Sequence, residues 1–440
     1  MTRASVTTQA PAAAAAAASA AAAAVSFEPG LAGPFSLQVP TEKDPGIRFE
    51  LERLLARARD IRPRLREAQA QTEIDGQYSQ EVHEYFLKHG FYRMLQPKMF
   101  GGLELGVSAF YQVIAEIARG CPSTAWCLSL SVGHSLTLGS FFEERAQREV
   151  FGENGYMICP ASGNGKNMTV ERVDGGWEVS GFWRYCSGAP YSTHFMATAY
   201  LPGEEPGGPE RRVWMILRRE DYEVQDDWGR VIGMRGSGSN SIKAEKAFVP
   251  DYCISEENWT AATSGETVGS KLHNNPVYAG TFFGFAEGEV AATSVGLGYA
   301  AVDEFEKIIR NTRHPWIKDG AMRAEYEEWQ RVLGMAISYV DAAQSILVNS
   351  SRLFEEYAAR SVAGFEAFDE SRSMRLNGVY FVAEELVFKA VDLMLHNAGS
   401  QNSADGAPLQ RYFRDILTTR TRTDTFELFS VNTGTAHLQA

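Results

Sequence analysis

Two segments near the middle of the chain decide its fold. They read FWRYCSG at residues 182–188 and WGRVIGMRGSGSN at residues 228–240. Both lie within 168–251, where apolar and polar side chains alternate with the period of two that is typical of β-strands. Runs at 170–173 and 177–179 flank Asp174-Gly175-Gly176, whose glycines tolerate the positive φ angles of a hairpin turn. With further strands predicted at 195–200, 213–217 and 242–249, we expect an antiparallel β-domain.

Helical patterns surround this β-region on both sides. Before it, Leu51, Leu54 and Leu55 recur at helical spacing, and apolar helices are predicted at 107–119 and 123–138. After it, four long apolar stripes predict an up-and-down bundle with helices at 284–311, 321–359, 366–397 and 409–437. We therefore expect an α+β protein with an N-terminal α-helical domain (46–155), a central antiparallel β-domain (156–258) and a C-terminal four-helix bundle (259–440).

Composition narrows the class of function. The 440 residues include 42 basic and 55 acidic side chains, a formal net charge of −13. Phosphate binding needs clustered Lys and Arg, so this balance argues against nucleic-acid and anionic-membrane partners. We find no run of about 18 strongly apolar residues and predict no membrane span. The five cysteines form no CxxC pair and the eight histidines do not cluster, which favours a reduced, cytoplasmic protein without a metal site.

The N-terminal residues are unusual because 11–25 are almost all Ala. This run resembles the apolar part of a signal peptide, but it lacks Leu and Phe. A disordered or frayed-helical tail over 1–45 is the preferred interpretation, with secretion as the alternative.

Several well-known catalytic motifs are absent from the sequence. No GxGxxG follows a predicted strand, and GxxxxGK[ST], GxSxG and HExxH do not occur. Nicotinamide-dependent, kinase, hydrolase and zinc-protease activities therefore lack their usual signatures.

The order of elements and three short motifs resemble a known fold. The motifs are Cys186-Ser187-Gly188 at a strand end, GMRGSGSN at 233–240 and LQRYFRD at 409–415. Over about 48–438 they are similar to the acyl-CoA dehydrogenase fold, and more narrowly to its two-component flavin-dependent monooxygenases, such as 4-hydroxyphenylacetate hydroxylase oxygenase and dibenzothiophene monooxygenase. The resemblance implies reduced FMN or FAD supplied by a separate NAD(P)H:flavin reductase, and a homotetramer. It also implies insertion of one oxygen atom from a C4a-(hydro)peroxyflavin into a small molecule.

The resemblance also implies roles for individual residues. Ser187 would hold the flavin N5–H and so delay loss of H₂O₂, although a Ser before a Gly also commonly caps a turn. His134 would orient the substrate or accept its proton, the alternative being a core histidine with satisfied hydrogen bonds. Trp126 and Cys186 would lie against the cofactor.

Two further groups of flavin contacts are implied at other points of the chain. In the first, Arg235, Ser237 and Ser239 would meet polar flavin or phosphate groups, although a Gly-rich turn between strands explains this loop equally simply. In the second, Arg313 would reach the flavin or its pyrophosphate, often across a subunit boundary, and Gly399-Ser400 would face the cofactor. A solvated arginine and a plain helix C-cap are the respective alternatives.

One departure from the family pattern concerns the end of the last motif. Dehydrogenases of this subclass carry a catalytic Glu at the position of Thr423, and phenol hydroxylases often have a His where this chain has Arg422. Arginine stays protonated, so it would attract an anionic group instead of acting as a base. A salt bridge from Arg422 to Asp424 or Glu427 is the alternative.

These observations support one function and leave others open. We expect an oxygenase component that hydroxylates an aromatic or polyketide-like substrate. N- or S-oxygenation on the same fold, an FAD-dependent acyl-CoA dehydrogenase and a catalytically silent helical scaffold are the alternatives.

Overall fold

The computed structural model describes residues 42–439 except 164, 204–207 and 423–425. The predicted tail therefore lies almost wholly outside the described residues. The first helix, α2, begins at Pro45, with the Asp44 side chain accepting hydrogen bonds from two backbone N–H groups as its N-cap.

The N-terminal part of the chain is helical, as predicted. Its helices are α2 (Pro45–Asp75), α3 (Gln80–His89), α4 (Val107–Ala118), α5 (Pro122–Val132), α6 (His134–Phe141) and α7 (Glu144–Asn154). The single helix predicted over 123–138 is divided into α5 and α6 at Gly133. Position 133 has no room for a side chain, because a Cβ there would lie 1.9 Å from Oε1 of Glu289.

The central part forms two four-stranded sheets, in the orders β1-β4-β5-β8 and β2-β3-β7-β6. The strands are β1 (Ala161–Ser162), β2 (Gly165–Val173), β3 (Gly176–Trp183), β4 (His194–Leu201), β5 (Arg211–Arg218), β6 (Glu223–Val224), β7 (Ile242–Pro250) and β8 (Ile254–Glu256). All pairs are antiparallel except the short β1–β4 pair. The predicted hairpin is confirmed, since Val173 pairs with Gly176 and Gly175 has a φ of 75°.

The core of the sheets also includes helical residues. Phe142 and Phe151, from the α6–α7 region, are fully buried in the same cluster as Phe195 and Trp214 of the strands. The end of α6 and helix α7 therefore pack with the β-domain, although the sequence pattern groups them with the helices before them.

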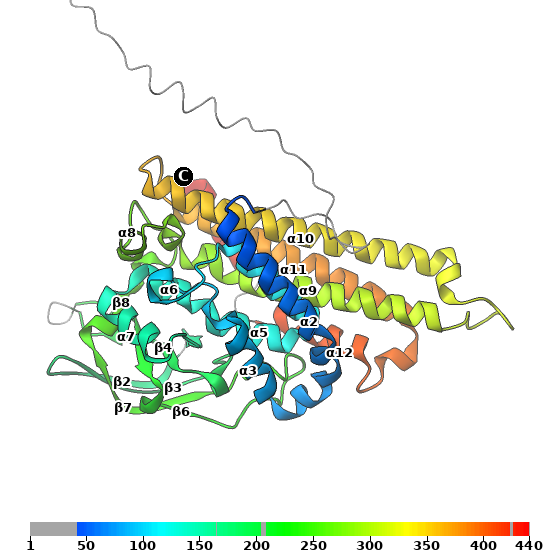
Figure 1. Ribbon diagram of the computed structural model, residues 1–440, viewed down its shortest axis with the longest axis horizontal. Helices are drawn as coiled ribbons and strands as arrows, with labels where there is room; N and C mark the ends of the chain where they lie inside the picture. The colour runs from blue at the N-terminus through cyan, green and yellow to red at the C-terminus, as the bar shows by residue number, and fades with distance from the viewer. Residues whose placement is uncertain (1–41, 164, 204–207, 423–425, 440) are drawn as a thin grey trace, which may run out of the picture. The chain divides into compact units, whose positions relative to one another are not determined.

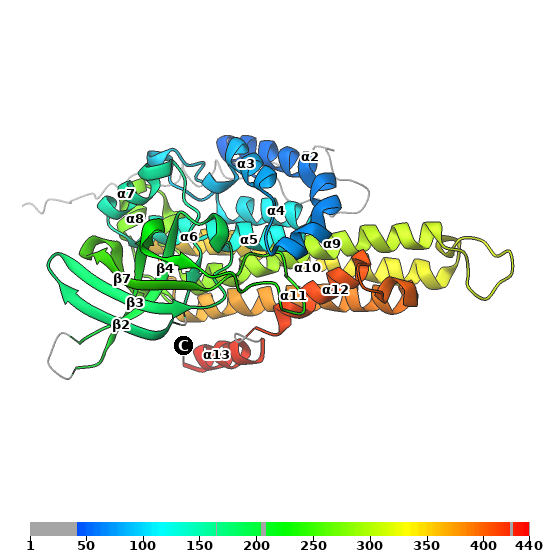
Figure 2. The ribbon, with the colours of Figure 1, turned by 90° about the horizontal axis from the view of Figure 1, so that it is seen from below.

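The C-terminal part is a helical bundle. Its helices are α8 (Val268–His273), α9 (Phe282–Asn311), α10 (Glu327–Val362), α11 (Glu370–Ala398), α12 (Pro408–Arg420) and α13 (Phe426–Gln439). Figures 1 and 2 show α9, α10 and α11 side by side, with α12 alongside and α13 on α11. The fourth predicted helix, 409–437, is thus two helices that meet near the undescribed residues 423–425.

Helix α10 requires a separate remark about membranes. Among the described residues it is the one helix that is long and apolar enough to cross a bilayer, judged by length and composition alone. It packs against α9 and α11 in the bundle. A core helix of a globular protein meets the same criteria.

Candidate active site

Four of the predicted site residues, Trp126, Ser187, Ser237 and Ser239, converge where the connection from β3 to β4 meets helix α5. Tyr185 has a φ of 60° and Gly188 a φ of 85°, so the chain turns sharply on both sides of Ser187. Position 188 requires glycine, because a Cβ would also lie 2.7 Å from the Cβ of Ser131 on α5. This turn buries Ser187 while it leaves 68% of Tyr185 exposed.

A chain of buried hydrogen bonds links four of the predicted residues. The indole N–H of Trp126 donates to the Ser187 hydroxyl at 3.0 Å. The Ser187 and Ser239 hydroxyls are 2.8 Å apart, and the Ser239 and Ser237 hydroxyls 2.7 Å apart. All four side chains are at most 9% exposed. The structure therefore brings together two segments that lie about fifty positions apart in the sequence.

Backbone contacts hold the loop that carries Ser237 and Ser239. The N–H of Gly188 donates to the carbonyl of Gly238 at 3.1 Å, and the N–H of Gly238 donates to the carbonyl of Gly76 at 2.7 Å. The third predicted residue of this loop, Arg235, donates from Nε to the Val231 carbonyl at 2.8 Å. Its guanidinium thus stabilises the loop itself.

His134 lies at the start of α6, with 7% of its surface exposed. Nδ1 is 2.8 Å from the carbonyl oxygen of Cys159, which can only accept, so Nδ1 carries the proton and Nε2 is left as an acceptor. The backbone of Leu130 also hydrogen-bonds to the imidazole. Burial lowers the pKa of His134 to about 4, so the imidazole is neutral at neutral pH.

Arg422 forms a two-pronged ion pair with Glu287 of α9. Nη1 and Nη2 lie 3.1 and 3.0 Å from Oε1 and Oε2, and Glu287 is only 2% exposed. The guanidinium carbon is 6.0 Å from the centre of the Trp126 ring. Arg422 is therefore adjacent to the indole that bonds to Ser187, and its described carboxylate partner is neither of the two predicted from the sequence. Thr423 and Asp424 lie outside the described residues.

A second buried carboxyl group, that of Glu289, lies beside this pair. Its Oε1 accepts a hydrogen bond from the Ser129 hydroxyl at 3.4 Å, and the side chain is 1% exposed. Burial raises the pKa of Glu289 well above its usual value, and the nearby Glu287 raises it further. Burial thus favours the protonated form of Glu289, while Arg422 and the Ser129 hydrogen bond favour the carboxylate.

The remaining predicted residues take no part in this hydrogen-bond chain through their side chains. Cys186 is fully buried in the β-domain core, with Sγ 3.6 Å from the carbonyl oxygen of Trp183. Arg313 is exposed and donates to the carbonyl of Gly320 in the loop between α9 and α10. Gly399 and Ser400 follow α11 at the same end of the bundle, which is remote from the sheets (Figure 1).

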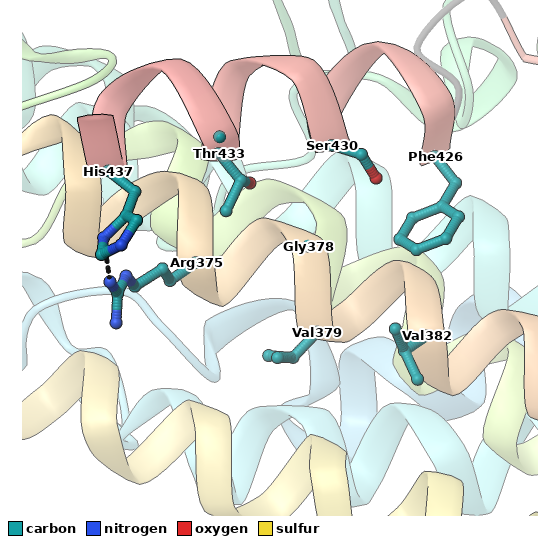
Figure 3. A pocket seen from close by; sticks show the side chains of 9 residues that line it. Arg375, Gly378, Val379, Val382, Phe426, Ser430, Thr433 and His437 are labelled. Atoms are coloured by element: carbon teal, nitrogen blue, oxygen red, sulfur yellow. Dashed lines mark hydrogen bonds between the residues drawn. The ribbon is translucent and has the colours of Figure 1, made fainter. Parts of the chain in front are cut away.

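A pocket of about 580 Å³ lies elsewhere, between α11 and α13 (Figure 3). Arg375 and His437 hydrogen-bond at one end of it, and Val379, Val382 and Phe426 contribute apolar surface. It shares no lining residue with the cluster around Ser187.

Sequence reasoning missed three carboxyl groups and one aromatic ring at the site. The carboxyl groups are those of Glu287, Glu289 and Asp415, and the ring is that of Tyr185, which meets Trp228 edge-on with centroids 5.8 Å apart. One signal was available. Glu287 and Glu289 lie two residues apart in a run of small and apolar residues at the start of α9, where a carboxylate needs a partner.

The side chains around Ser187 suit a flat ring that carries polar groups. Ser187 presents a hydroxyl in a buried turn, and Tyr185 and Trp228 supply aromatic surface beside that turn. A flavin needs a hydrogen-bonding group at N5, which Ser187 can supply.

Two models of protein-family domains match the chain. The model of the acyl-CoA dehydrogenase N-terminal domain matches residues 50–149, and that of the C-terminal domain matches 289–423. A pigment production hydroxylase of Rhodococcus sp. is 30% identical over 363 residues, 82% of this chain and 90% of that protein. The chain belongs to the flavin-dependent monooxygenases of the acyl-CoA dehydrogenase fold. The predicted family and fold are thereby confirmed.

Other members of the family extend the match. The oxygenase subunit HsaA of a flavin-dependent monooxygenase from Rhodococcus jostii is 30% identical to this monooxygenase over 355 residues, 80% of this chain and 89% of that protein. The crystal structure of 3-HSA hydroxylase from Rhodococcus sp. RHA1 superposes with a TM-score of 0.76 at 26% identity, covering 88% of this chain and 97% of that one.

Proposed function

We propose that this monooxygenase is the oxygenase component of a two-component system that hydroxylates a small aromatic molecule. Its reduced FMN or FAD would come from a separate NAD(P)H:flavin reductase. The observation that carries this proposal is the buried Trp126–Ser187–Ser239–Ser237 hydrogen-bond chain in a member of this family. We also propose a homotetramer, as the family resemblance implies, in which Arg313, Gly399 and Ser400 would reach the flavin of another subunit.

The Ser187 hydroxyl is suited to accept a hydrogen bond from a ring N–H group. A hydroxyl group has one donor and two acceptor positions, and the Trp126 N–H takes one acceptor position. When Ser187 donates to Ser239, its second lone pair is free to accept the N5–H of a reduced flavin. Bound reduced flavin supplies the activation of O₂, and the protein's part is to hold that N–H away from water.

His134 is suited to orient a substrate hydroxyl through Nε2. With a pKa of about 4 it is a weak base, and taking a proton fully from a phenol with a pKa of about 10 would cost roughly 8 kcal/mol. We therefore assign it the role of hydrogen-bond acceptor. The same weakness favours N- or S-oxygenation as the second candidate, since a nucleophilic heteroatom needs no deprotonation.

Stopped-flow mixing tests the proposal. The protein with reduced FMN or FAD is mixed with oxygen, and the return of the oxidised-flavin absorbance is followed. We expect a long delay in the wild type. For Ser187→Ala we expect a delay roughly 5- to 150-fold shorter, corresponding to one hydrogen bond of about 1–3 kcal/mol.

Ser162→Ala is the matched control, because Ser162 is also buried but bonds to the carbonyl of Arg184, outside the hydrogen-bond chain. It should leave the delay unchanged. Immediate reoxidation with both flavins in the wild type would refute the proposed oxygenase, and equal delays in Ser187→Ala and the wild type would remove Ser187 from its mechanism.

A further inference from the structure

The charge of Arg422 is already neutralised within the protein. Nη1 donates to Oε1 of Glu287 and Nη2 to Oε2, and the Glu287 side chain is 3% exposed against 23% for Arg422. A fork-to-fork pair of this kind is held in one geometry and is shielded from solvent on its carboxylate side. An anion that approached the guanidinium would also be repelled by the carboxylate paired with it, which would offset part of the attraction.

The pair faces the predicted reaction centre through Trp126. The same indole ring lies 6.0 Å from the guanidinium carbon and donates its N–H to Ser187. A substrate placed near Ser187 therefore experiences the sum of the two charges, which is close to zero.

The next carboxyl group along α9 adds no positive charge to this pair. Glu289 lies two residues further along α9 and is buried against Ser129. Burial raises the pKa of this carboxyl group well above its usual value, which favours its neutral form. An incoming carboxylate would lose its hydration here. The only cation among Arg422, Glu287 and Glu289 is Arg422, which is already paired with Glu287.

We propose that Glu287 is a specificity-determining residue, which cancels the charge of Arg422 so that the site takes an uncharged aromatic substrate in preference to an aromatic carboxylate. This inference rests on the proposed function and adds the charge class of its substrate. It replaces the expectation from the sequence that Arg422 attracts an anionic group.

Binding of two nearly isosteric probes tests this inference without turnover. The dissociation constants of 4-hydroxybenzamide and 4-hydroxybenzoate are measured at pH 8 by quenching of tryptophan fluorescence, with oxidised FMN or FAD present. We expect the wild type to bind the amide at least about tenfold more tightly than the acid. In Glu287→Gln the guanidinium is no longer neutralised, so the ratio of the two constants should shift by about tenfold or more towards the acid.

Two further variants keep the inference testable if Glu287→Gln folds poorly. Glu287→Asp keeps the negative charge and should retain the wild-type preference. The double variant Glu287→Gln/Arg422→Gln removes both charges and should also restore it. Circular dichroism establishes that each variant is folded.

Each outcome has a definite meaning. A wild type that prefers the acid, or an unchanged ratio in folded Glu287→Gln, would overturn the role of Glu287 and leave the proposed oxygenase intact. If neither probe binds to the wild type while the delayed flavin reoxidation is observed, the aromatic substrate class fails, and the inference about its charge fails with it.

Discussion

Asp415 of α12 accepts the backbone N–H of Met234 at 2.6 Å. Met234 has a φ of 53°, and its carbonyl in turn accepts the N–H of Ser237 at 3.1 Å. Asp415 is 1% exposed, and burial raises its pKa to about 7. The helix that carries the last sequence motif thus holds the loop that carries the Ser237 and Ser239 hydroxyls. Asp415 is therefore a positioning residue for the hydrogen-bond chain.

Replacement of Asp415 tests this relationship. Asp415→Ala leaves the buried Met234 N–H without a partner and should lower the free energy of unfolding by about 1–3 kcal/mol. Asp415→Asn keeps an acceptor oxygen for this N–H, so its free energy of unfolding should fall by less. Urea unfolding measures both, and flavin reoxidation should be faster in the Ala variant only. Equal stability of the two variants would show that the contact to Met234 contributes little.

The order of the hydroxyl groups predicts a graded effect on flavin reoxidation. Ser239→Ala removes the hydroxyl that, in the proposed direction of the chain, accepts the hydrogen bond from Ser187, whereas Ser237→Ala removes one that is a further bond away. We expect Ser239→Ala to shorten the delay by roughly 5-fold or more, as for loss of a hydrogen bond of about 1 kcal/mol, and Ser237→Ala to have a smaller effect. Stopped-flow absorbance provides the comparison. A larger effect at Ser237 would contradict the proposed direction of the chain.

His134 should make the protein less stable as the pH falls. Its pKa is about 4 in the folded state against 6.5 for an exposed histidine, so the unfolded chain takes up a proton first. Stability is therefore lost between pH 6.5 and about 4, by up to roughly 3 kcal/mol. His134→Gln should remove this part of the pH dependence, which denaturant titrations from pH 4 to 8 can measure. His194, whose pKa is also about 4, titrates in both proteins, so their difference isolates His134.

Glu355 should act in the opposite direction. It lies on α10 and accepts a hydrogen bond from the N–H of Ser108, at the start of α4, at 3.0 Å. Burial raises the pKa of Glu355 to about 7; this hydrogen bond lowers the pKa and the nearby Glu42 raises it. The folded state keeps this proton while the unfolded state loses it near pH 4.5, so stability falls as the pH rises from 4.5 to about 7.

Glu355→Gln keeps the acceptor for Ser108 without the charge. Its stability relative to the wild type should increase across pH 4.5–7, by up to roughly 3 kcal/mol, and then level off. Thermal melting at several pH values measures the difference. A difference that is constant with pH would show that Glu355 has an ordinary pKa.

Local patterns predicted the elements of this fold well, and long-range contacts explain what they missed. The hairpin at Gly175 and the helix from Val107 follow from side-chain periodicity and turn residues. The ion pair between Arg422 and Glu287 could not be predicted in the same way, because the two residues lie 135 positions apart in the sequence. The resemblance to a family brought Trp126, Ser187 and Ser239 into one site, and the structure supports that grouping by direct hydrogen bonds.

Gly133 has a consequence for sequence variation in this family. Because glycine has no Cβ, the Glu289 carboxyl can occupy the space beside position 133. A methyl group added there would lie 1.9 Å from Oε1 of Glu289. The two positions are therefore sterically coupled, and we expect them to covary: a chain with alanine or a larger residue at 133 should carry a shorter side chain at 289. Gly133→Ala should accordingly be tolerated much better when combined with Glu289→Ala than alone.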